Sequence, residues 1–319
     1  LLLVGPGAGR HGSGACRSAR MWGDCPDARA LPWGDVEAAF SGSEVARLRA
    51  AIEAELRRPE FLARVARAMA LDGEVRHDAK GLFVLGPSAA GKSHLLRQGG
   101  VEEAAVEAPR GALTLDGAIV RQASASWAEA VDLAASRGFA GLTNLFADFF
   151  KAPMDQAKEQ IVQEAVRAKA NLIIPDTASN FAATVRTIDR LLGQGYSLQF
   201  VAIYADRSVC EARGLRREIQ EGKKYSGTNW RASVQAIVSA QEYILSRGLL
   251  RETGGVRVLD CSGVPRRIDL AGVEARLSGA RPPELGGPGE EARPGRLRAA
   301  RCCCPRGLLG LLRAAAPRP

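Results

Sequence analysis

The sequence predicts a three-layer α/β fold: a mostly parallel sheet with helices on both faces, a helical lid, and a disordered tail at each end. Three observations support this prediction. Short apolar segments alternate with helical ones across residues 80–260, a glycine-rich loop follows the first of them, and Gly, Pro and Arg dominate both ends. The 319 residues, 46% hydrophobic and 25% charged, suffice for one large domain of this kind.

Five short apolar segments have the length and composition of buried strands. They are Gly81–Leu85, Ala112–Leu115, Leu172–Ile174, Leu198–Tyr204 and Val256–Leu259. The helical segments that separate them are Lys92–Gln98, Ser126–Ser136, Pro153–Lys169, Phe181–Leu192, Ser208–Gln220 and Trp230–Ser246. Such alternation forms parallel sheets, whose ligands bind beyond the carboxyl ends of the strands. We therefore expect functional side chains just after each strand.

The chain divides into four regions. Residues 41–75 form a helical extension, because apolar side chains recur there at helical spacing and Pro59 suits the first turn of a second helix. This extension covers one side of the sheet or contacts a partner. Residues 76–278 form the main domain. Residues 1–40 and 279–319 show no periodicity and are expected to be disordered.

The amino-terminal end contains two further features. Leu1–Gly12 resembles a strand followed by a glycine loop, but Arg10 and His11 stand where a phosphate-binding loop needs Gly-Lys, so we reject it. The chain begins with Leu1 rather than Met, which we interpret as the start of a fragment from which a targeting sequence can be missing.

The formal charge of +9 resides mainly in the two ends. Residues 1–34 carry +2 and residues 281–319 carry +5, which leaves +2 for residues 35–280. Proteins that bind nucleic acid spread many cations over their folded surface. The nearly neutral centre therefore argues against a nucleic-acid partner.

The cysteines and the apolar runs give information about the cellular location of the protein. The seven cysteines show no CxxC or matched His spacing that would indicate zinc or a disulfide framework. We interpret them as reduced thiols, which predicts a cytoplasmic protein. No apolar run approaches the ~20 residues that a membrane span requires, so no membrane association is expected.

The loop after the first strand is a complete G-x-x-x-x-G-K-S motif. It reads Gly86, Pro87, Ser88, Ala89, Ala90, Gly91, Lys92 and Ser93. The glycines let successive backbone N–H groups face phosphates, Lys92 supplies a cation for the β and γ phosphates, and the Ser93 hydroxyl is placed to ligate Mg²⁺. A chance glycine-rich turn would not be expected between an apolar strand and a helix. The motif therefore predicts binding of ATP, or GTP, together with Mg²⁺.

The rest of the chain selects among the reactions that P-loops support. A GTPase would carry an Asn-Lys-x-Asp motif, which the sequence lacks. A kinase needs a carboxylate near the acceptor hydroxyl, another near the metal, and cations that close over the phosphoryl group. Asp116 ends the second strand and is followed by Arg121, so it is a candidate base, although an Asp-Gly turn would look the same. Asp176 follows the third strand and is a candidate metal-supporting carboxylate, or else a solvated loop residue.

A cluster of cations follows the fourth strand and is the candidate lid. Its members are Arg213, Arg216, Arg217, Lys223 and Lys224. Cations in a lid neutralise charge in the transition state, whereas an ordinary surface helix carries the same residues as a solvated face. We favour the lid.

With these elements placed, residues 80–247 resemble the zeta toxin family of P-loop kinases. The matching features are the Gly-Lys-Ser of the P-loop, Leu115-Asp116-Gly117, Glu159, Thr177, Gly195-Tyr196 and the Arg213–Arg217 helix. Members of this family phosphorylate a sugar hydroxyl of UDP-N-acetylglucosamine or related nucleotide sugars with ATP and Mg²⁺. Several act as toxins that an antitoxin protein holds inactive.

The resemblance implies roles for particular residues. Lys92 and Ser93 serve ATP and magnesium, Glu159 falls where the family contacts its substrate, and Arg216 falls where a lid arginine meets the phosphates. Thr177 and Arg121 are grouped with Glu159 as substrate-binding residues, and Arg213 and Arg217 with the lid. Lys224 or Arg231 stands in for a second lid arginine.

Two positions depart from the family pattern. The family has an Asp-x-Asp pair at the end of the second strand, but here Ala118 occupies the position of the base. The family's Glu-Gly-Thr reads Pro175-Asp176-Thr177 here. Either Asp116 or Asp176 has taken over the base role, the acceptor differs, or catalysis has been lost.

The sequence thus predicts an ATP-dependent kinase that phosphorylates a hydroxyl of a small molecule, with a nucleotide sugar as one acceptor class. We expect Lys92, Asp116 and Arg216 to be its catalytic residues, and Ser93 and Asp176 to hold the metal. The alternative is a nucleotide-binding switch or scaffold without catalysis, which Ala118 favours. An antitoxin-like protein partner is implied by the resemblance alone.

Overall fold

The structure is a computed structural model, and it describes residues 31–98 and 100–279. The disorder expected for residues 1–30 and 280–319 and the rejected loop at Leu1–Gly12 lie outside these residues. Across the described part, no helix has both the length and the apolar character needed to cross a lipid bilayer.

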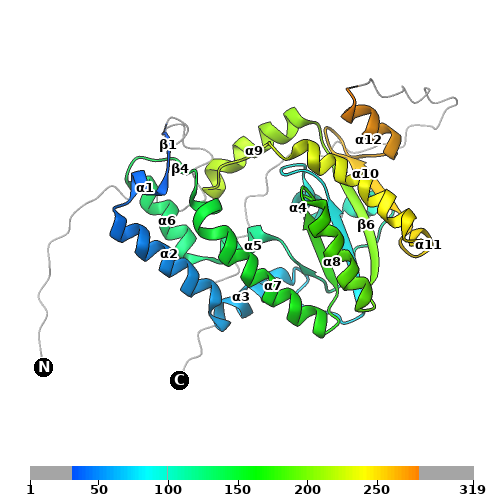
Figure 1. Ribbon diagram of the computed structural model, residues 1–319, viewed down its shortest axis with the longest axis horizontal. Helices are drawn as coiled ribbons and strands as arrows, with labels where there is room; N and C mark the ends of the chain where they lie inside the picture. The colour runs from blue at the N-terminus through cyan, green and yellow to red at the C-terminus, as the bar shows by residue number, and fades with distance from the viewer. Residues whose placement is uncertain (1–30, 99, 280–319) are drawn as a thin grey trace, which may run out of the picture. The chain divides into compact units, whose positions relative to one another are not determined.

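A six-stranded sheet organises the described chain, in the order β3-β5-β2-β6-β7-β8 (Figure 1). Its strands are β2 (Lys80–Leu85), β3 (Leu113–Thr114), β5 (Leu172–Asp176), β6 (Ser197–Tyr204), β7 (Val256–Asp260) and β8 (Arg266–Ile268). Neighbours pair in parallel except β8, which runs antiparallel to β7. The prediction of a mostly parallel sheet with five strands is therefore confirmed. The edge strand β8 was not predicted, because Arg266–Ile268 contains no apolar run.

Strand β2 lies in the middle of this sheet because both of its faces are apolar. Leu82 and Val84 belong to one hydrophobic cluster, and Phe83 and Leu85 belong to another. All four side chains are fully buried. Phe83 stacks on Phe200 of β6 with ring centroids 5.3 Å apart. The alternation of side chains along a strand thus produces two cores, one on each face of the sheet.

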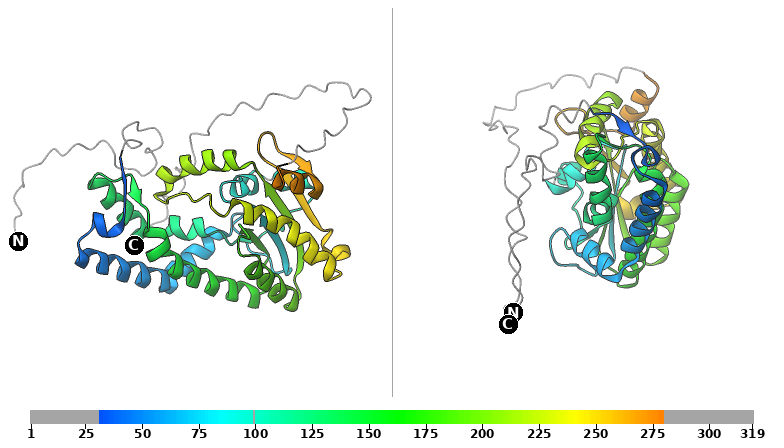
Figure 2. Two further views of the ribbon diagram at one scale, coloured as in Figure 1. Left: turned by 45° about the horizontal axis from the view of Figure 1, so that its top comes forward. Right: turned by 90° about the vertical axis from the view of Figure 1, so that its left-hand side faces the viewer.

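Helices cover both faces (Figures 1 and 2). Those of the main domain are α4 (Lys92–Arg97), α5 (Gly117–Ala123), α6 (Ala125–Ser136), α7 (Lys151–Arg167), α8 (Phe181–Gly193), α9 (Arg207–Glu221), α10 (Trp230–Ser246), α11 (Leu250–Thr253) and α12 (Leu270–Leu277). Two further helical segments are the 3₁₀ helix η3 (Gly100–Ala104) and the π-helix η4 (Leu145–Phe150), which leads into α7. Leu95 of α4 packs in the cluster of Leu82, whereas Ile188 of α8 and Ile237 of α10 pack in the cluster of Phe83. The predicted three layers are present.

The helical extension is part of the same core rather than a separate layer. It consists of α2 (Gly42–Arg57) and α3 (Pro59–Met69), and Pro59 is at the start of α3 as predicted. Five side chains at helical spacing are buried in the cluster that contains Phe83, namely Ile52, Leu56, Phe61, Val65 and Met69. These two helices pack against α5, α6 and α7.

Glu55 joins the extension to the main domain through an unusual cap. Its carboxylate, on α2, accepts hydrogen bonds from the Ser124 hydroxyl (2.7 Å) and from the backbone N–H groups of Ala125 and Ser126 (2.8 and 2.9 Å). These groups form the amino-terminal end of α6, whose first N–H groups have no partner within the helix. Burial opposes ionisation of Glu55, but the hydrogen bonds outweigh it and lower the pKa of this carboxyl.

Residues 31–40 differ from the disordered segment expected there. They include the short strand β1 (Trp33–Gly34) and a helical turn, α1 (Val36–Ala39), and β1 pairs in parallel with β4 (Gly141–Leu142). The pairing joins residues more than 100 positions apart, and the segment itself has no strand or helix periodicity. Local sequence therefore gave no sign of this structure.

Candidate active site

The P-loop follows β2 and has the backbone shape that its glycines permit. Gly86 and Gly91 have φ angles of 139° and 112°, and Ala89 has a φ of 63°. A Cβ atom at Gly86 would lie 2.1 Å from the carbonyl oxygen of Ile203, so only glycine fits at this position. The loop is therefore held against β6 by close backbone contact.

The backbone of this loop offers a set of unpaired donors. Among the described residues, no acceptor is found for the N–H groups of Ser88, Ala89, Gly91, Lys92 and Ser93. Successive N–H groups without partners around a curled loop form an anion-binding concavity. The backbone geometry of the loop therefore suits a phosphate group, independently of the sequence motif.

Lys92 lies within this loop as its cation. Its ammonium group donates hydrogen bonds to the carbonyl oxygens of Gly86 (2.6 Å) and Pro87 (2.9 Å). Burial lowers the pKa of Lys92 to about 8, and the carboxylates of Asp116 and Asp176 partly oppose this shift. Both predicted carboxylates therefore lie near the predicted phosphate-binding lysine.

Ser93 and Asp116 are in direct contact. The Ser93 hydroxyl donates a hydrogen bond of 2.9 Å to Oδ2 of Asp116. The other oxygen, Oδ1, accepts the N–H of Ala118 at 2.9 Å, so Asp116 is the N-cap of α5. The Asp-Gly pair therefore starts a helix that sequence reasoning did not predict, and this cap fixes the orientation of the carboxylate.

Asp176, the last residue of β5, is held by the loop that follows it and by α8. Its Oδ1 accepts the N–H of Ala178 at 2.9 Å and its Oδ2 accepts the Thr184 hydroxyl at 2.8 Å. Among the described residues, no hydrogen bond joins it to Ser93. The serine expected to ligate Mg²⁺ thus contacts Asp116 rather than Asp176.

One of the predicted lid arginines connects the P-loop to the end of β7. Arg213, on α9, donates to the carbonyl oxygen of Ala90 (3.0 Å) and to that of Cys261 after β7 (2.8 Å). Arg216 is exposed and makes no hydrogen bond or ion pair with the described residues. Arg213 therefore ties α9 to the P-loop, whereas Arg216 extends from the helix surface.

The end of α9 brings two arginines to one carboxylate, and a lysine follows it. Glu221 pairs with the buried Arg121 at 2.5 Å and with Arg217 at 2.8 Å. Lys223 follows, with its ammonium 3.7 Å from the centre of the Phe146 ring. Burial and the neighbouring Arg121 lower the pKa of Lys223 to about 8, while Glu221 and Asp116 oppose this. Residues 207–224, which we call the lid, thus bring Lys223 to the ring of Phe146, over which Arg121 also lies.

Lys223 belongs to the predicted cation cluster, but its neighbour Lys224 is the one predicted to be the lid residue. In the structure, Lys224 pairs with Glu218 at 3.3 Å and lies over the ring of Trp33. Two adjacent lysines look alike in a sequence, and only the path of the chain after α9 decides which one faces inward. The sequence also gave no sign of Phe146 or Glu221, because their contacts with Lys223 and Arg121 join segments that are distant in the chain.

The remaining predicted substrate residues lie at other contacts. Glu159 pairs with Arg190 of α8 at 2.6 Å, and about half of its side chain is exposed. Thr177 lies after β5, where its hydroxyl is 3.4 Å from that of Ser179. Arg121 is the one that the structure brings to the Glu221 cluster beside Asp116.

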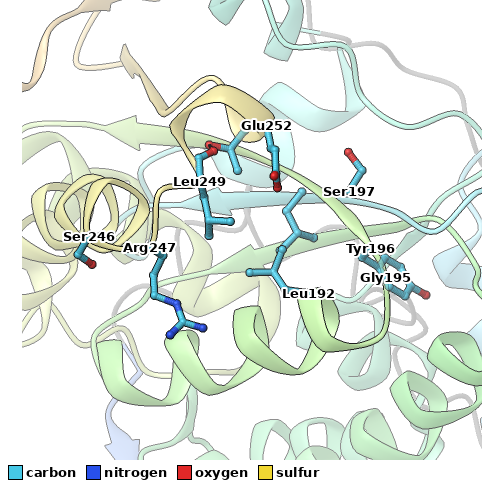
Figure 3. Close-up of a pocket in the computed structure, with 10 residues that line it drawn as sticks. Leu192, Gly195, Tyr196, Ser197, Ser246, Arg247, Leu249 and Glu252 are labelled. Carbon is cyan, nitrogen blue, oxygen red and sulfur yellow. Dashed lines mark hydrogen bonds between the residues drawn. The ribbon is translucent and has the colours of Figure 1, made fainter.

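A separate pocket lies at the opposite edge of the sheet (Figure 3). It has a volume of about 740 Å³ and is lined from the end of α8, the start of β6, and α10–α11, with Leu192, Arg247 and Glu252 among its residues. Ligands of parallel sheets bind beyond the carboxyl ends of the strands, where the P-loop is. We therefore do not assign this pocket to the nucleotide.

The comparisons with known proteins agree with this arrangement. Residues 74–252 match the zeta toxin family. The chain belongs to the zeta toxin family. It is therefore of the P-loop kinase type, a nucleotide-binding phosphotransferase at the level of the family. The matched region of this zeta toxin family member begins before β2 and ends within α11.

Several solved structures are similar to this zeta toxin family member. One is the PezAT chromosomal toxin–antitoxin system of Streptococcus pneumoniae, with 16% identity, 67% of this chain and 81% of that chain covered, and a TM-score of 0.46. Another is the AvrRxo1-ORF1:AvrRxo1-ORF2 complex with ATP, with 12% identity, 78% and 75% covered, and a TM-score of 0.46. The native form of that complex has 12% identity, 75% and 74% covered, and a TM-score of 0.44. No curated protein matches the chain.

Proposed function

We propose that this protein transfers the γ-phosphoryl group of ATP to a hydroxyl of a small molecule, with a nucleotide sugar such as UDP-N-acetylglucosamine as the first acceptor to test. The observation that carries the proposal is the contact between Ser93 of the P-loop and Asp116. It puts a carboxylate at the edge of a phosphate-binding loop, where an acceptor must approach the γ phosphate.

In the proposed reaction, the acceptor oxygen forms a bond to the γ phosphorus while the bond from that phosphorus to the bridging β–γ oxygen breaks, and ADP leaves. The acceptor's proton passes to Asp116. Oδ2 of Asp116 already accepts a hydrogen bond from one hydroxyl, that of Ser93, at 2.9 Å. An oxygen in this position can therefore meet a hydroxyl in the geometry that a general base requires.

The cations supply electrostatic stabilisation in this proposal. Lys92 and the unpaired N–H groups of the P-loop bind the phosphates of ATP, or of GTP as a second nucleotide to test. Arg216 extends from the lid, Arg213 on the same helix ties the lid to Ala90, and Arg217 pairs with Glu221 within the lid. Cations positioned in advance around a transferring phosphoryl group lower the barrier without reorganisation.

Magnesium would neutralise charge on the phosphates, and Ser93 with Asp176 would hold it. Within the described residues, no cluster of three or more His, Cys, Asp or Glu side chains could hold a metal by itself. Mg²⁺ in phosphoryl-transfer sites is ordinarily held by one or two protein oxygens together with phosphates and water. The hydroxyl and carboxylate oxygens at this site fit that pattern.

The test is ³¹P NMR of the protein with Mg·ATP and a pool of hydroxyl-bearing metabolites that includes UDP-N-acetylglucosamine. We expect a new phosphomonoester signal together with ADP. Lys92→Met should abolish both. The matched control is Lys151→Met, which removes an exposed lysine paired with Asp155 and should leave the product yield unchanged.

The second candidate function is a nucleotide-binding switch without catalysis. Ala118 favours it, because its backbone N–H occupies Oδ1 of Asp116 and its side chain offers no second carboxylate. ATP binding that depends on Lys92, without any phosphorylated product, would support the switch and refute the kinase. Under the kinase proposal, Asp116→Asn reduces transfer by more than about a hundredfold while ATP still binds.

The biological setting is a separate part of the proposal. An antitoxin-like protein partner and a cytoplasmic location are proposed from the family and from the thiols of Cys210 and Cys261, which form no disulfide. Expression of the protein should arrest growth, and Lys92→Ala should relieve the arrest. Growth arrest that persists in the Lys92→Ala variant would separate toxicity from nucleotide binding.

A further inference from the structure

A short segment before α2 is fastened to residues far along the chain. Residues 32–37, which we call the strap, run beside residues 140–144. The N–H of Ala140 donates to the carbonyl oxygen of Pro32 (2.9 Å), and that of Thr143 donates to the oxygen of Gly34 (2.8 Å). Asn144 adds side-chain hydrogen bonds to the N–H of Val36 (2.9 Å) and to Glu37 (2.8 Å). The strap lies outside the region that matches the family, which begins at residue 74.

Close packing fixes this pairing in one register. Gly34 lies against the ring of Phe139 and Gly141 lies against the ring of Trp33, so that a Cβ atom at either glycine would lie 2.5 Å from a ring atom. Trp33 pairs with Gly141, and Gly34 pairs with Leu142. Any slip by one residue would place a side chain where these rings lie.

The far side of β4 pairs with the end of the lid. Leu142 is almost completely buried, and it forms a parallel bridge with Lys223. Backbone from residues 33–34, 141–142 and 223 therefore lies side by side, and Figure 1 shows β1 and β4 near the end of α9. The ammonium of Lys224 lies 4.8 Å from the centre of the Trp33 ring, which adds a direct contact between strap and lid.

This arrangement determines where the ammonium of Lys223 lies. The bridge to Leu142 sets the backbone of Lys223, and its side chain then reaches the face of Phe146, 3.7 Å from the ring centre. Arg121 of α5, the helix that Asp116 caps, lies over the same ring, and the charges of Arg121, Glu221 and Asp116 contribute to the pKa shift of this ammonium. Gly222, with a φ of 60°, directs the chain from α9 into this position and packs against Val131.

We infer that the strap positions the lid, and that Trp33 is a positioning residue that holds Lys223 over the ring of Phe146, next to Arg121 of the helix that Asp116 caps. The expected effect on phosphoryl transfer rests on the proposed function, whereas the expected effect on the position of the lid does not. The strap acts through Lys223, so removal of Trp33 slows phosphoryl transfer while the P-loop continues to bind ATP.

The experiment compares the full chain with Trp33→Ala, with Trp33→Phe, which keeps an aromatic ring, and with Tyr243→Ala. Tyr243 is the matched control, because it also carries a cation over its ring, Arg247, but lies near the end of α10. Hydrogen exchange followed by mass spectrometry reports on peptides that cover residues 221–226. We expect Trp33→Ala to speed exchange there about tenfold, Trp33→Phe to restore slow exchange, and Tyr243→Ala to have no effect.

The second measurement is steady-state phosphorylation of UDP-N-acetylglucosamine. We expect Trp33→Ala to lower kcat about tenfold and to change the KM for ATP by less than about twofold, because displacement of one positioned group affects the chemical step. Lys223→Met should lower kcat by a similar factor. Adding Trp33→Ala to Lys223→Met should then cause less than about a twofold further loss, since the strap acts through that lysine.

Unchanged exchange at residues 221–226 in Trp33→Ala overturns the inference. Faster exchange with kcat unchanged, or losses that multiply in the double variant, overturns the role of Trp33 through Lys223. If the wild-type protein phosphorylates nothing, the proposed function fails, and the exchange measurement still decides whether the strap holds the lid.

Discussion

Glu55 is a residue whose removal should cost far more than that of its neighbours on the same helix. Glu55→Ala leaves three donors at the start of α6 without an acceptor and leaves Arg64 without its 3.7 Å partner. We expect a loss of about 3 kcal/mol in the free energy of unfolding, measured by urea denaturation. The control Glu53→Ala removes an exposed ion pair with Arg57 and should cost less than about 0.5 kcal/mol. Equal losses would contradict the cap.

The same carboxyl makes stability depend on pH. Its folded-state pKa lies below the ordinary value of 4.5, so its stabilising effect is complete above that value and is lost as pH falls through the folded pKa. We expect the stability difference between wild type and Glu55→Gln to shrink as the pH falls below about 4.5, as followed by thermal unfolding. A difference that stays constant from pH 7 to pH 3 would show that Glu55 is not ionised in the folded protein.

The lowered pKa of Lys92 leads us to expect that ATP binding depends on pH. Its pKa of about 8 lies below the ordinary 10.5, so the ammonium form costs stability below pH 8, and this cost disappears as pH rises from about 8 to 10.5. Phosphates favour the charged form, so ATP binding raises this pKa and takes up protons near pH 8.5. Calorimetry in buffers of different ionisation enthalpy should detect the uptake. Lys92→Met should abolish it, while Lys223→Met, which removes the other lysine with a pKa of about 8, should retain it.

Among the structural elements, the P-loop depends most on a single backbone position. Gly86→Ala forces a Cβ atom to within 2.1 Å of the Ile203 carbonyl oxygen at a φ of 139°, so the loop or β6 must move. We expect a loss of more than about 3 kcal/mol in stability and the loss of ATP binding. Gly193→Ala is the control, because that helical glycine has open space around it and should gain up to about 1 kcal/mol. Intact ATP binding in Gly86→Ala would contradict the loop geometry.

The lid shows how an element can be predicted while its orientation is not. The helical spacing of Ser208–Gln220 predicted α9 to within one residue at each end. How its cations are oriented depends on contacts that no local pattern contains: Arg213 with Cys261, Arg121 with Glu221, and Lys223 with Leu142. These contacts join residues between about 50 and 100 positions apart.

At the scale of the whole described chain, the larger of the two cores, the cluster that contains Phe83, extends beyond the family match. Ile52, Leu56, Phe61, Val65 and Met69 precede the matched region and are at most 2% exposed. Burial of five such side chains contributes roughly 10 kcal/mol, which is comparable to the entire stability of a typical domain. We propose that residues 41–75 are an integral part of the kinase domain rather than an appendage.

This proposal predicts the effect of truncation. A chain that starts at residue 74 should lose cooperative thermal unfolding and bind hydrophobic dyes, because the cluster around Phe83 would be open to water. The full chain is the reference, and Leu71→Ala, at a leucine that is 51% exposed, is the control for a surface change in the same region. Cooperative unfolding of the truncated chain at an unchanged temperature would show that the extension is a separate unit.

The residue pattern alone was sufficient for the layers, for five of the six strands of the main sheet, and for the glycine loop after β2. These features depend on neighbours in the chain. The length and composition of an apolar run such as Leu82–Leu85 favour a buried strand, and the glycines between Gly86 and Ser93 allow the loop to curl. Folding in three dimensions decided the rest: the strand at Trp33–Gly34, the cap that Glu55 provides for α6, and the choice of Lys223 over Lys224. Each of these results from contact between segments that are distant in the chain, and the energy of such a contact leaves no periodicity or motif in either segment.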